Sequence, residues 1–207
     1  GYHWASRGVD EYQVFGFMPG NLPANAATIR NTHAQGKAIA GEPVLQPGRR
    51  VSGVQAQLWS ETIRTDGQVD YMLFPRLLAL AERAWSPATW APPYGAGATY
   101  EWGDKRVDAV KLKAGWQDFA GRVAAQLPML DKMGIAYRVA PPGARIVDGR
   151  LEANTVFPGT AIEYRVVGGD WTRYSGPVGV SGEIELRSRS ADGKRTSRTV
   201  RVAAPVR

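Results

Sequence analysis

The pattern of apolar and polar positions in residues 51–87 predicts one β-strand followed by one buried α-helix. Apolar and polar residues alternate toward the end of 51–59, which is the period of a strand. Helical spacing follows at 71–86, and its apolar arc is wide, so we expect this helix to be heavily buried. We expect its regular part to begin near Pro75 and to end at Ser86. The arc consists of Leu73, Phe74, Leu77, Leu78, Leu80, Ala81, Ala84 and Trp85.

A second helical pattern occupies residues 107–133. Gly134 follows it directly and is a typical C-terminal stop. After the segment GIAYRV and the turn Pro141-Pro142-Gly143 the helical period disappears, so we predict a domain boundary between residues 135 and 136. The apolar residues on one side of this helix are Trp116, Phe119, Val123, Leu127 and Leu130.

Short alternating runs separated by glycine-rich turns fill residues 136–207. The dipeptide Asp192-Gly193 between two of these runs predicts a hairpin. Short strands at nearly regular spacing are typical of a small antiparallel β-sandwich. The predicted strands are 144–147, 151–156, 162–167, 184–189 and 196–202.

Two stretches have weaker patterns. Residues 9–17 predict a short helix or an extended segment, and residues 89–104 form a loop rich in Gly, Pro and aromatic residues. The loop either provides a sugar platform or packs against the rest of the domain. We expect packing, because nothing in its spacing requires a ligand.

Composition excludes several classes of chemistry. The chain has 207 residues, no cysteine, two histidines and a formal net charge of +7. Disulfides and thiolate catalysis are therefore excluded, and His3 and His33 are too isolated to predict a metal site. No apolar run approaches the roughly 20 residues of a membrane span. The basic excess permits an anionic-polymer ligand, but the cations alternate with acids along the strands. We therefore expect a solvated sheet face and no nucleic-acid partner.

The amino-acid sequence of residues 51–87 resembles that of family 20 glycoside hydrolases, the β-N-acetylhexosaminidases, and is most similar to that of the bacterial chitobiases. The resemblance rests on GVQAQLWSE, followed by YMLFPRLLALAERAWSP, and on the earlier segment GYHWASR. It implies that residues 1–135 are the C-terminal part of a (β/α)8 TIM barrel, with 51–59 as the last strand and 71–86 as the last helix. It also implies that residues 136–207 form an immunoglobulin-like domain.

The same resemblance implies a sugar-binding role for three side chains. Trp59 would form a wall of the pocket for the terminal sugar, and Glu61 would accept hydrogen bonds from two of its hydroxyl groups. Trp4 would stack on the sugar beyond the scissile bond. Asp10-Glu11 is the one Asp-Glu pair in the chain, and its context does not match the family's catalytic pair, so we predict no catalytic residue in this chain. Within the helix, we expect Arg76, Glu82 and Arg83 to be structural ion partners.

The function implied is release of non-reducing terminal N-acetylglucosamine, or N-acetylgalactosamine, from chitin oligosaccharides or glycans. The family uses substrate-assisted retaining catalysis without a cofactor and is typically periplasmic or secreted. We expect the rest of the barrel to be supplied by N-terminal sequence or by a companion chain. Two alternatives remain: a non-catalytic carbohydrate-binding or interaction module, and a basic β-domain that binds an anionic polymer.

Overall fold

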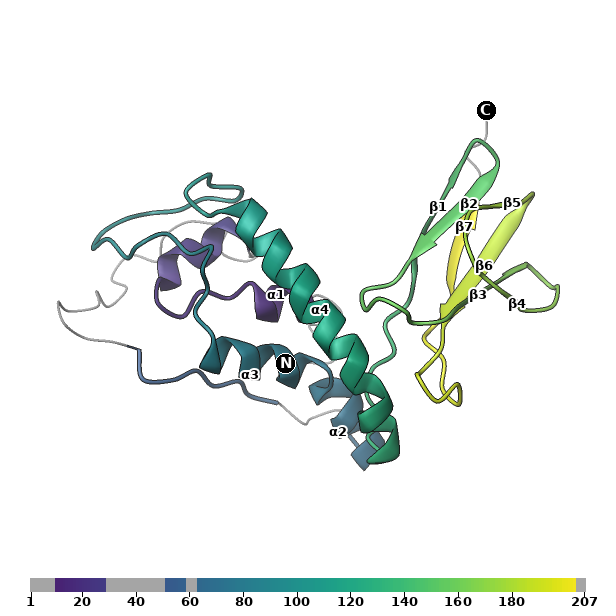
Figure 1. The fold of residues 1–207 in the computed structure, drawn as a ribbon, viewed down its shortest axis with the longest axis horizontal. Helices are drawn as coiled ribbons and strands as arrows, with labels where there is room; N and C mark the ends of the chain where they lie inside the picture. The colour runs from purple at the N-terminus through teal and green to yellow at the C-terminus, as the bar shows by residue number, and fades with distance from the viewer. Residues whose placement is uncertain (1–9, 29–50, 59–62, 204–207) are drawn as a thin grey trace. The chain divides into compact units, whose positions relative to one another are not determined.

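The computed structural model describes residues 10–28, 51–58 and 63–203 and divides the chain into two compact units. Within these ranges, the first unit contains residues 10–28, 51–58, 63–65 and 72–118, and the second contains 66–71 and 119–203. Figure 1 shows the helices of the chain in purple to teal and its strands in green to yellow. The expected boundary at residue 135 remains a prediction.

The structure does not show the strand that the sequence predicted at residues 51–59. Residues 51–58 form no strand, and residue 59 lies outside the described part of the chain. A β-strand exists through hydrogen bonds to a neighbouring strand, and no described segment pairs with 51–58. The barrel itself is therefore not seen and remains a prediction.

The predicted helix at 71–86 is two helices. Helix α2 spans Asp66–Leu73, and helix α3 spans Arg76–Trp85 after Pro75, as predicted for its regular part. The peptide bond between Phe74 and Pro75 is cis. Helix α3 ends at Ser86, whose extended backbone leaves the helix, as the sequence predicted.

The prediction that the apolar arc of α3 is heavily buried is wrong for the described structure. The buried residues of α3 are Arg76, Ala79 and Arg83. None of the eight residues of the predicted arc is buried. Four of them are half-buried, whereas Leu77, Ala81 and Ala84 are exposed and Trp85 is 89% exposed. Apolar residues need a facing surface to be buried, and no described residue supplies one for these four.

The long helix was predicted closely. Helix α4 spans Ala109–Lys132 and continues through Pro128. Four of its five predicted apolar residues are buried, namely Phe119, Val123, Leu127 and Leu130. At its end, the Gly134 N–H donates to the Asp131 carbonyl and the Ile135 N–H donates to the Leu130 carbonyl. This is a Schellman arrangement, and it requires the left-handed backbone of Gly134, whose φ is +74°.

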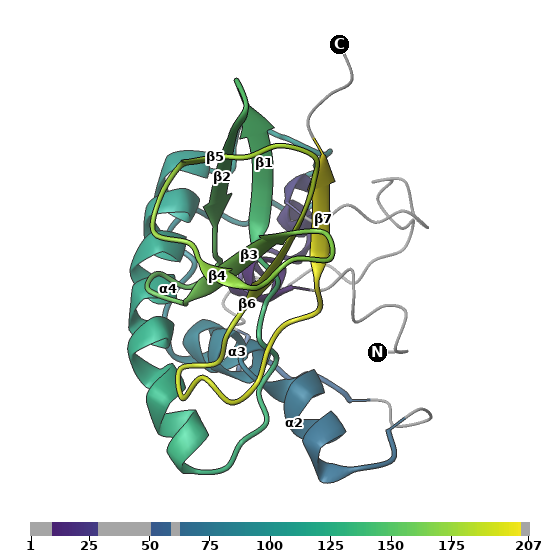
Figure 2. The same ribbon diagram turned by 90° about the vertical axis from the view of Figure 1, so that its right-hand side faces the viewer.

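The C-terminal part is a sandwich of two antiparallel sheets, as predicted (Figure 2). One sheet has the order β1-β2-β5 and the other has the order β4-β3-β6-β7. Each predicted strand has a counterpart, and two strands of two residues each were missed. The strands are β1 Gly143–Val147, β2 Arg150–Asn154, β3 Ile162–Val166, β4 Thr172–Arg173, β5 Val178–Gly179, β6 Glu183–Ser188 and β7 Val200–Ala203.

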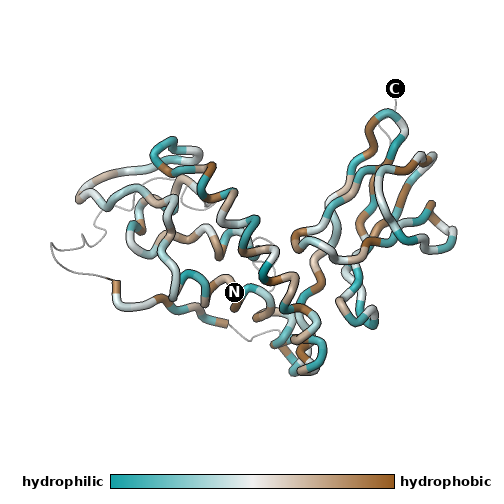
Figure 3. The backbone as a smooth tube through the Cα atoms, viewed as in Figure 1, coloured by the Kyte–Doolittle hydropathy of each residue, from teal (hydrophilic) through white to brown (hydrophobic). Residues whose placement is uncertain are grey.

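Apolar residues from both sheets form the sandwich core, centred on Leu151, Ile162, Ile184 and Leu186. They alternate with polar residues along their strands, a change of colour that can be followed along the tube in Figure 3. The predicted hairpin at Asp192-Gly193 joins β6 to β7 through a longer loop, in which the Ser190 N–H donates to the Arg195 carbonyl.

Candidate functional site

The three predicted sugar-binding residues, Trp4, Trp59 and Glu61, lie outside the described residues. The structure describes the segment that follows them, which begins at residue 63 and enters α2 at Asp66. The geometry of the predicted sugar site therefore remains a prediction, and the surrounding framework is what the structure defines.

The Asp10-Glu11 pair belongs to a short helix, α1, which spans Glu11–Phe15. Asp10 is its N-cap, and the Asp10 Oδ1 atom accepts the Gln13 N–H at 2.9 Å. Glu11 is 2% exposed, and its Oε1 atom has no hydrogen-bond partner among the residues that the structure describes. Asp10 therefore has a local structural role as a helix cap.

Two arginines of α3 are buried. The sequence had predicted both of them to be structural ion partners. Arg83 lies beside Glu82, with 3.9 Å between Nη2 and Oε1, and its guanidinium carbon is 4.6 Å from the ring centroids of both Phe15 and Trp90. Arg76 donates from Nη1 to the Met72 carbonyl at 2.6 Å. The aromatic contacts of Arg83 were not predicted, because they depend on residues far apart in the sequence.

The aromatic loop after α3 packs into its own unit, as predicted. Trp90 is buried, and its indole N–H donates to the Gly16 carbonyl at 3.2 Å. Tyr100 is also buried, whereas Trp102 is exposed. Two of the four aromatic rings of the loop are therefore buried in their own unit.

Asn21 organises this loop, and sequence reasoning missed it. Its side chain is almost fully buried, and its Nδ2 atom donates to the carbonyls of Pro92 and Pro93 and to the hydroxyl oxygen of Tyr100 at 3.1–3.3 Å. The sequence shows only that Asn21 lies in the turn-rich segment PGNLPANA. Its hydrogen-bond partners could not be predicted, because they lie more than 70 residues away.

A pocket of about 590 Å³ lies beside this loop. Arg106 covers the Tyr100 ring there, with 4.0 Å from its guanidinium carbon to the ring centroid. Hydrogen bonds from Arg106 lower the pKa of Asp104 to about 2, so the pair stays charged at any physiological pH. The lining residues are Thr89, Trp90, Ala91, Pro92, Pro93, Gly95, Ala98, Tyr100, Arg106, Asp108 and Lys111.

The outer face of the four-stranded sheet carries two glutamates, each held between two arginines. Glu163 accepts hydrogen bonds at 2.6–2.7 Å, and Glu185 accepts them at 2.7–3.0 Å. This face alternates in charge, which agrees with the predicted solvated face and not with a uniform cationic patch. The arginines are Arg187 and Arg189 around Glu163, and Arg165 and Arg201 around Glu185.

Trp171 contacts one arginine of the Glu185 group and one arginine of the Glu163 group. Its ring centroid lies 4.5 Å from the guanidinium carbon of Arg165 and 4.0 Å from that of Arg187. Burial raises the pKa of Glu163, but hydrogen bonds from its two arginines outweigh burial, so this pKa lies below the ordinary value. Hydrogen bonds from Arg165 and Arg201 likewise lower the pKa of Glu185.

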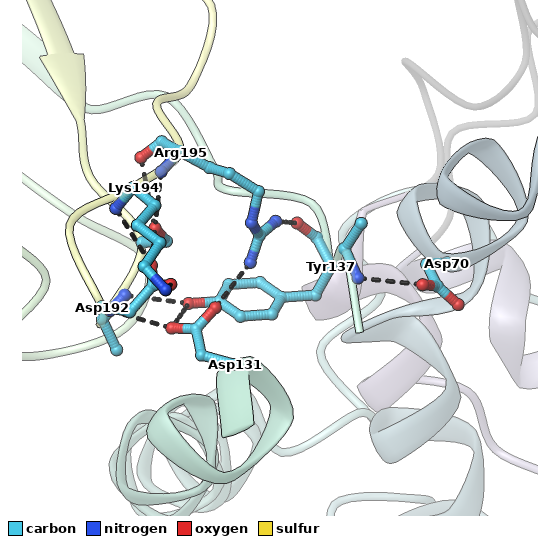
Figure 4. Close-up of polar contacts among 9 residues, drawn as sticks. Asp70, Asp131, Tyr137, Asp192, Lys194 and Arg195 are labelled. Atoms are coloured by element: carbon cyan, nitrogen blue, oxygen red, sulfur yellow. Dashed lines mark hydrogen bonds and ion pairs between the residues drawn. The ribbon is translucent and has the colours of Figure 1, made fainter. Parts of the chain in front are cut away.

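A third polar cluster joins the end of α4 to the loop between β6 and β7 (Figure 4). Asp131 accepts from Arg195 Nη2 at 2.7 Å, from the Asp192 N–H at 2.9 Å and from the Tyr137 hydroxyl at 3.2 Å. Arg195 also lies over the Tyr137 ring, 4.3 Å from its centroid. Burial is the main reason that the pKa of Tyr137 is raised.

Metal binding and membrane insertion find no support within the described residues. No group of three or more His, Cys, Asp or Glu side chains in residues 10–28, 51–58 and 63–203 could hold a metal ion. Helices in the same part of the chain are too short or too polar to cross a bilayer.

Comparisons with known proteins show which protein families the two parts of the chain resemble. Residues 4–88 match the family model of the glycosyl hydrolase family 20 catalytic domain. Residues 126–199 match the model of the chitobiase/β-hexosaminidase C-terminal domain. These two matches confirm the resemblance found in the sequence to family 20 glycoside hydrolases.

Relatives match along nearly the whole chain. It is 40% identical over 205 residues to an N,N'-diacetylchitobiase of Vibrio harveyi, covering 98% of this chain and 23% of the relative. It is 39% identical to a β-hexosaminidase of Vibrio vulnificus, covering 99% of this chain and 25% of that protein. A β-hexosaminidase B of Pseudoalteromonas piscicida is 45% identical over 123 residues, covering 58% of this chain and 16% of the relative. The chain spans about a quarter of the length of the first two relatives.

Proposed function

We propose that this chain forms the end of the catalytic barrel and the C-terminal domain of a β-N-acetylhexosaminidase of the chitobiase type. The substrate class is a chitin oligosaccharide or glycan with a non-reducing terminal N-acetylglucosamine or N-acetylgalactosamine. The observation that carries the proposal is the 40% identity to a diacetylchitobiase across 98% of the chain. The site of action would be the periplasm or the exterior of the cell.

The exposed arc of α3 supports the barrel part of this proposal. Leu77, Ala81 and Trp85 are spaced four residues apart and therefore follow one another along a single face of the helix. A large exposed apolar face marks a surface that another segment covers in the working protein. The remainder of the barrel, on the same polypeptide or on a companion chain, is the expected partner.

The proposed reaction is hydrolysis with retention of configuration. The carbonyl oxygen of the substrate's 2-acetamido group attacks the anomeric carbon while a glutamic acid outside this chain protonates the leaving oxygen. The resulting oxazolinium is opened by water, which the same carboxylate then deprotonates. An aspartate next to that glutamate orients the acetamido nitrogen. This route differs from the two-carboxylate mechanism of most glycosidases.

This chain would contribute binding groups to that reaction. A Trp59 wall would exclude water beside the reacting carbon, and the Glu61 carboxylate would accept hydrogen bonds from the O4 and O6 hydroxyls of the terminal sugar. Trp4 would stack on the apolar face of the next sugar. Together they fix the sugar from one side, while proton transfer depends on residues elsewhere in the barrel.

A Glu61→Gln substitution in the complete protein tests this proposal with a 4-nitrophenyl N-acetyl-β-glucosaminide assay. The amide removes the charge from two hydrogen bonds, so we expect kcat/KM to fall by roughly 100-fold. Glu101→Gln is the matched control on an exposed loop and should leave the rate unchanged. A wild-type protein that binds N-acetylglucosamine oligomers without hydrolysing them would overturn the enzyme proposal in favour of a binding module.

A further inference from the structure

The pocket beside the aromatic loop combines an apolar wall with a polar rim. Its volume of about 590 Å³ lies within the roughly 300–1,000 Å³ of pockets that bind small molecules. All of its lining residues belong to the single segment 89–111 of the first unit. The wall includes Ala91, Pro92, Pro93 and Ala98, and the rim includes Thr89, Arg106, Asp108 and Lys111.

Hydrogen bonds from outside the pocket hold its wall in place. The buried Asn21 amide donates to the carbonyls of Pro92 and Pro93. The Asp108 N–H donates to the Trp90 carbonyl at 3.0 Å, which ties the start of α4 to the beginning of the loop. A pocket formed before its ligand arrives loses little conformational entropy on binding.

The charged groups of the rim are paired, so the rim is close to neutral. Arg106 bridges to Asp104 through Nε and Nη2, and the Lys111 Nζ atom lies 3.5 Å from the Asp108 Oδ2 atom. Hydrogen bonds lower the pKa of both carboxyl groups, the one from Arg106 at Asp104 and the one from the Lys111 N–H at Asp108. Both pairs are therefore ionised at neutral pH, and neither leaves an uncompensated charge.

Arg106 keeps one nitrogen atom unused. Its Nε and Nη2 atoms donate to Asp104, and Nη2 also donates to the Thr99 carbonyl. Among the residues that the structure describes, no hydrogen bond uses its Nη1 atom, which carries two N–H groups. The guanidinium also lies over the Tyr100 ring, so its plane is held on both sides of the salt bridge. A fixed side chain with two spare donors on a pocket is suited to a ligand with acceptor oxygens.

We propose that this pocket binds one neutral sugar ring. The C–H face of a pyranose would lie against the Pro92–Pro93 wall, its oxygens would accept from Arg106 Nη1, and a hydroxyl would donate to Asp108. Paired charges offer donors and acceptors without a net charge, which fits a neutral polyhydroxyl ligand better than a carboxylate or a phosphate. This inference goes beyond the proposed function, because it follows from the chemistry of the pocket.

The test uses the complete protein and N-acetylglucosamine, a neutral pyranose, as the probe. Amide hydrogen exchange of residues 89–111 is measured as the sugar concentration is raised. Arg106→Lys keeps the charge that Asp104 needs and removes the spare N–H groups, whereas Ala98→Trp fills the pocket. Arg145→Lys is the matched control, since Arg145 also pairs with a carboxylate but lies on β1 and is 73% exposed.

We expect saturable protection of residues 89–111 in the wild type, with a Kd on the order of 1 mM for so small a ligand. Arg106→Lys should weaken binding by roughly tenfold or more, because a charged hydrogen bond is lost. Ala98→Trp should abolish the protection, and Arg145→Lys should match the wild type. An increase in NaCl should leave Kd unchanged, because the ligand is uncharged.

Three results would overturn the inference. The first is a wild type without protection in 89–111, and the second is undiminished protection in Ala98→Trp. The third is equal protection by sodium acetate that weakens with salt, which would make the pocket an anion site.

The outcome is separable from that of the proposed function. Protection lost in Glu61→Gln but kept in Arg106→Lys would assign the sugar to the residues of the proposed function, and would also overturn the inference. A protein that does not hydrolyse the 4-nitrophenyl substrate but shows the expected protection would refute the proposed function and support the sugar pocket.

Discussion

The guanidinium of Arg195 lies 2.7 Å from the carboxylate of Asp131, although 64 residues separate them in the sequence. The Asp131 side chain is only 4% exposed, so it is one of the few nearly buried charges described in the chain. Such a carboxylate depends on its cation, because removal of one partner leaves a buried charge uncompensated.

Arg195→Ala should therefore lower the free energy of unfolding by about 3 kcal/mol, measured by urea denaturation. Arg145→Ala is the matched control, since Arg145 also pairs with a carboxylate, that of Glu152, but its side chain is 73% exposed. An exposed pair contributes little, so this control should lose less than about 1 kcal/mol. Equal losses in the two variants would contradict the importance of burial at Asp131.

The glutamates of the outer sheet face predict a loss of stability in acid. Because the pKa of Glu185 is lower in the folded chain than its ordinary value of 4.5, its contribution to stability is complete above that pH. The contribution is lost as the pH falls through the lowered pKa. The thermal midpoint of Glu185→Gln should therefore fall less between about pH 4.5 and pH 2 than that of the wild type.

Glu152→Gln provides the control for this acid effect. Glu152 is a half-buried carboxylate on β2 that pairs with one arginine, Arg145, among the described residues. Its substitution should leave the acid slope of the thermal midpoint close to that of the wild type. If the thermal midpoint of Glu185→Gln fell in acid as steeply as that of the wild type, the interaction with the two arginines would not depend on the charge of Glu185.

Two substitutions of Asn21 test whether its side chain acts as a hydrogen-bond donor. Asn21→Ala leaves the carbonyls of Pro92 and Pro93 without their donor and should destabilise the first unit by about 2 kcal/mol. Asn21→Asp has almost the same shape but points a carboxylate at the same oxygen atoms, so it should be the more destabilising of the two. Thermal unfolding measures both, and an Asp variant more stable than the Ala variant would contradict the donor role.

Trp85 tests whether the apolar arc of α3 is covered in the working protein. In the complete protein, Trp85→Arg would bury an unpaired charge if the rest of the barrel covers this face, and we expect a loss of about 3 kcal/mol. Trp102→Arg changes another exposed tryptophan and should cost less than about 0.5 kcal/mol. Small and equal effects would mean that the arc of α3 remains in solvent.

The sequence was sufficient for elements whose signals are local. The long apolar repeat and Gly134 located α4 and its end, because helical period and a left-handed stop act over a few residues. Alternation and glycine turns located the main strands of the sandwich for the same reason. The two-residue strands β4 and β5 escaped, because such short runs have no period to detect.

The candidate site was predicted from a sequence resemblance to a known family. The sugar-binding roles of Trp4, Trp59 and Glu61 remain predictions. What the sequence could not predict is every contact between distant segments: Asn21 with the proline carbonyls, Arg83 with Phe15 and Trp90, and Asp70 with Ala136. Periodicity also failed for the exposure of α3 and for the strand at 51–58. A periodic pattern states which face of an element is apolar, whereas burial and strand pairing depend on a second segment. The sequence by itself thus determined the local elements and the family, and the tertiary structure decided which side chains meet, because a hydrogen bond or a packed face requires two partners that only folding brings together.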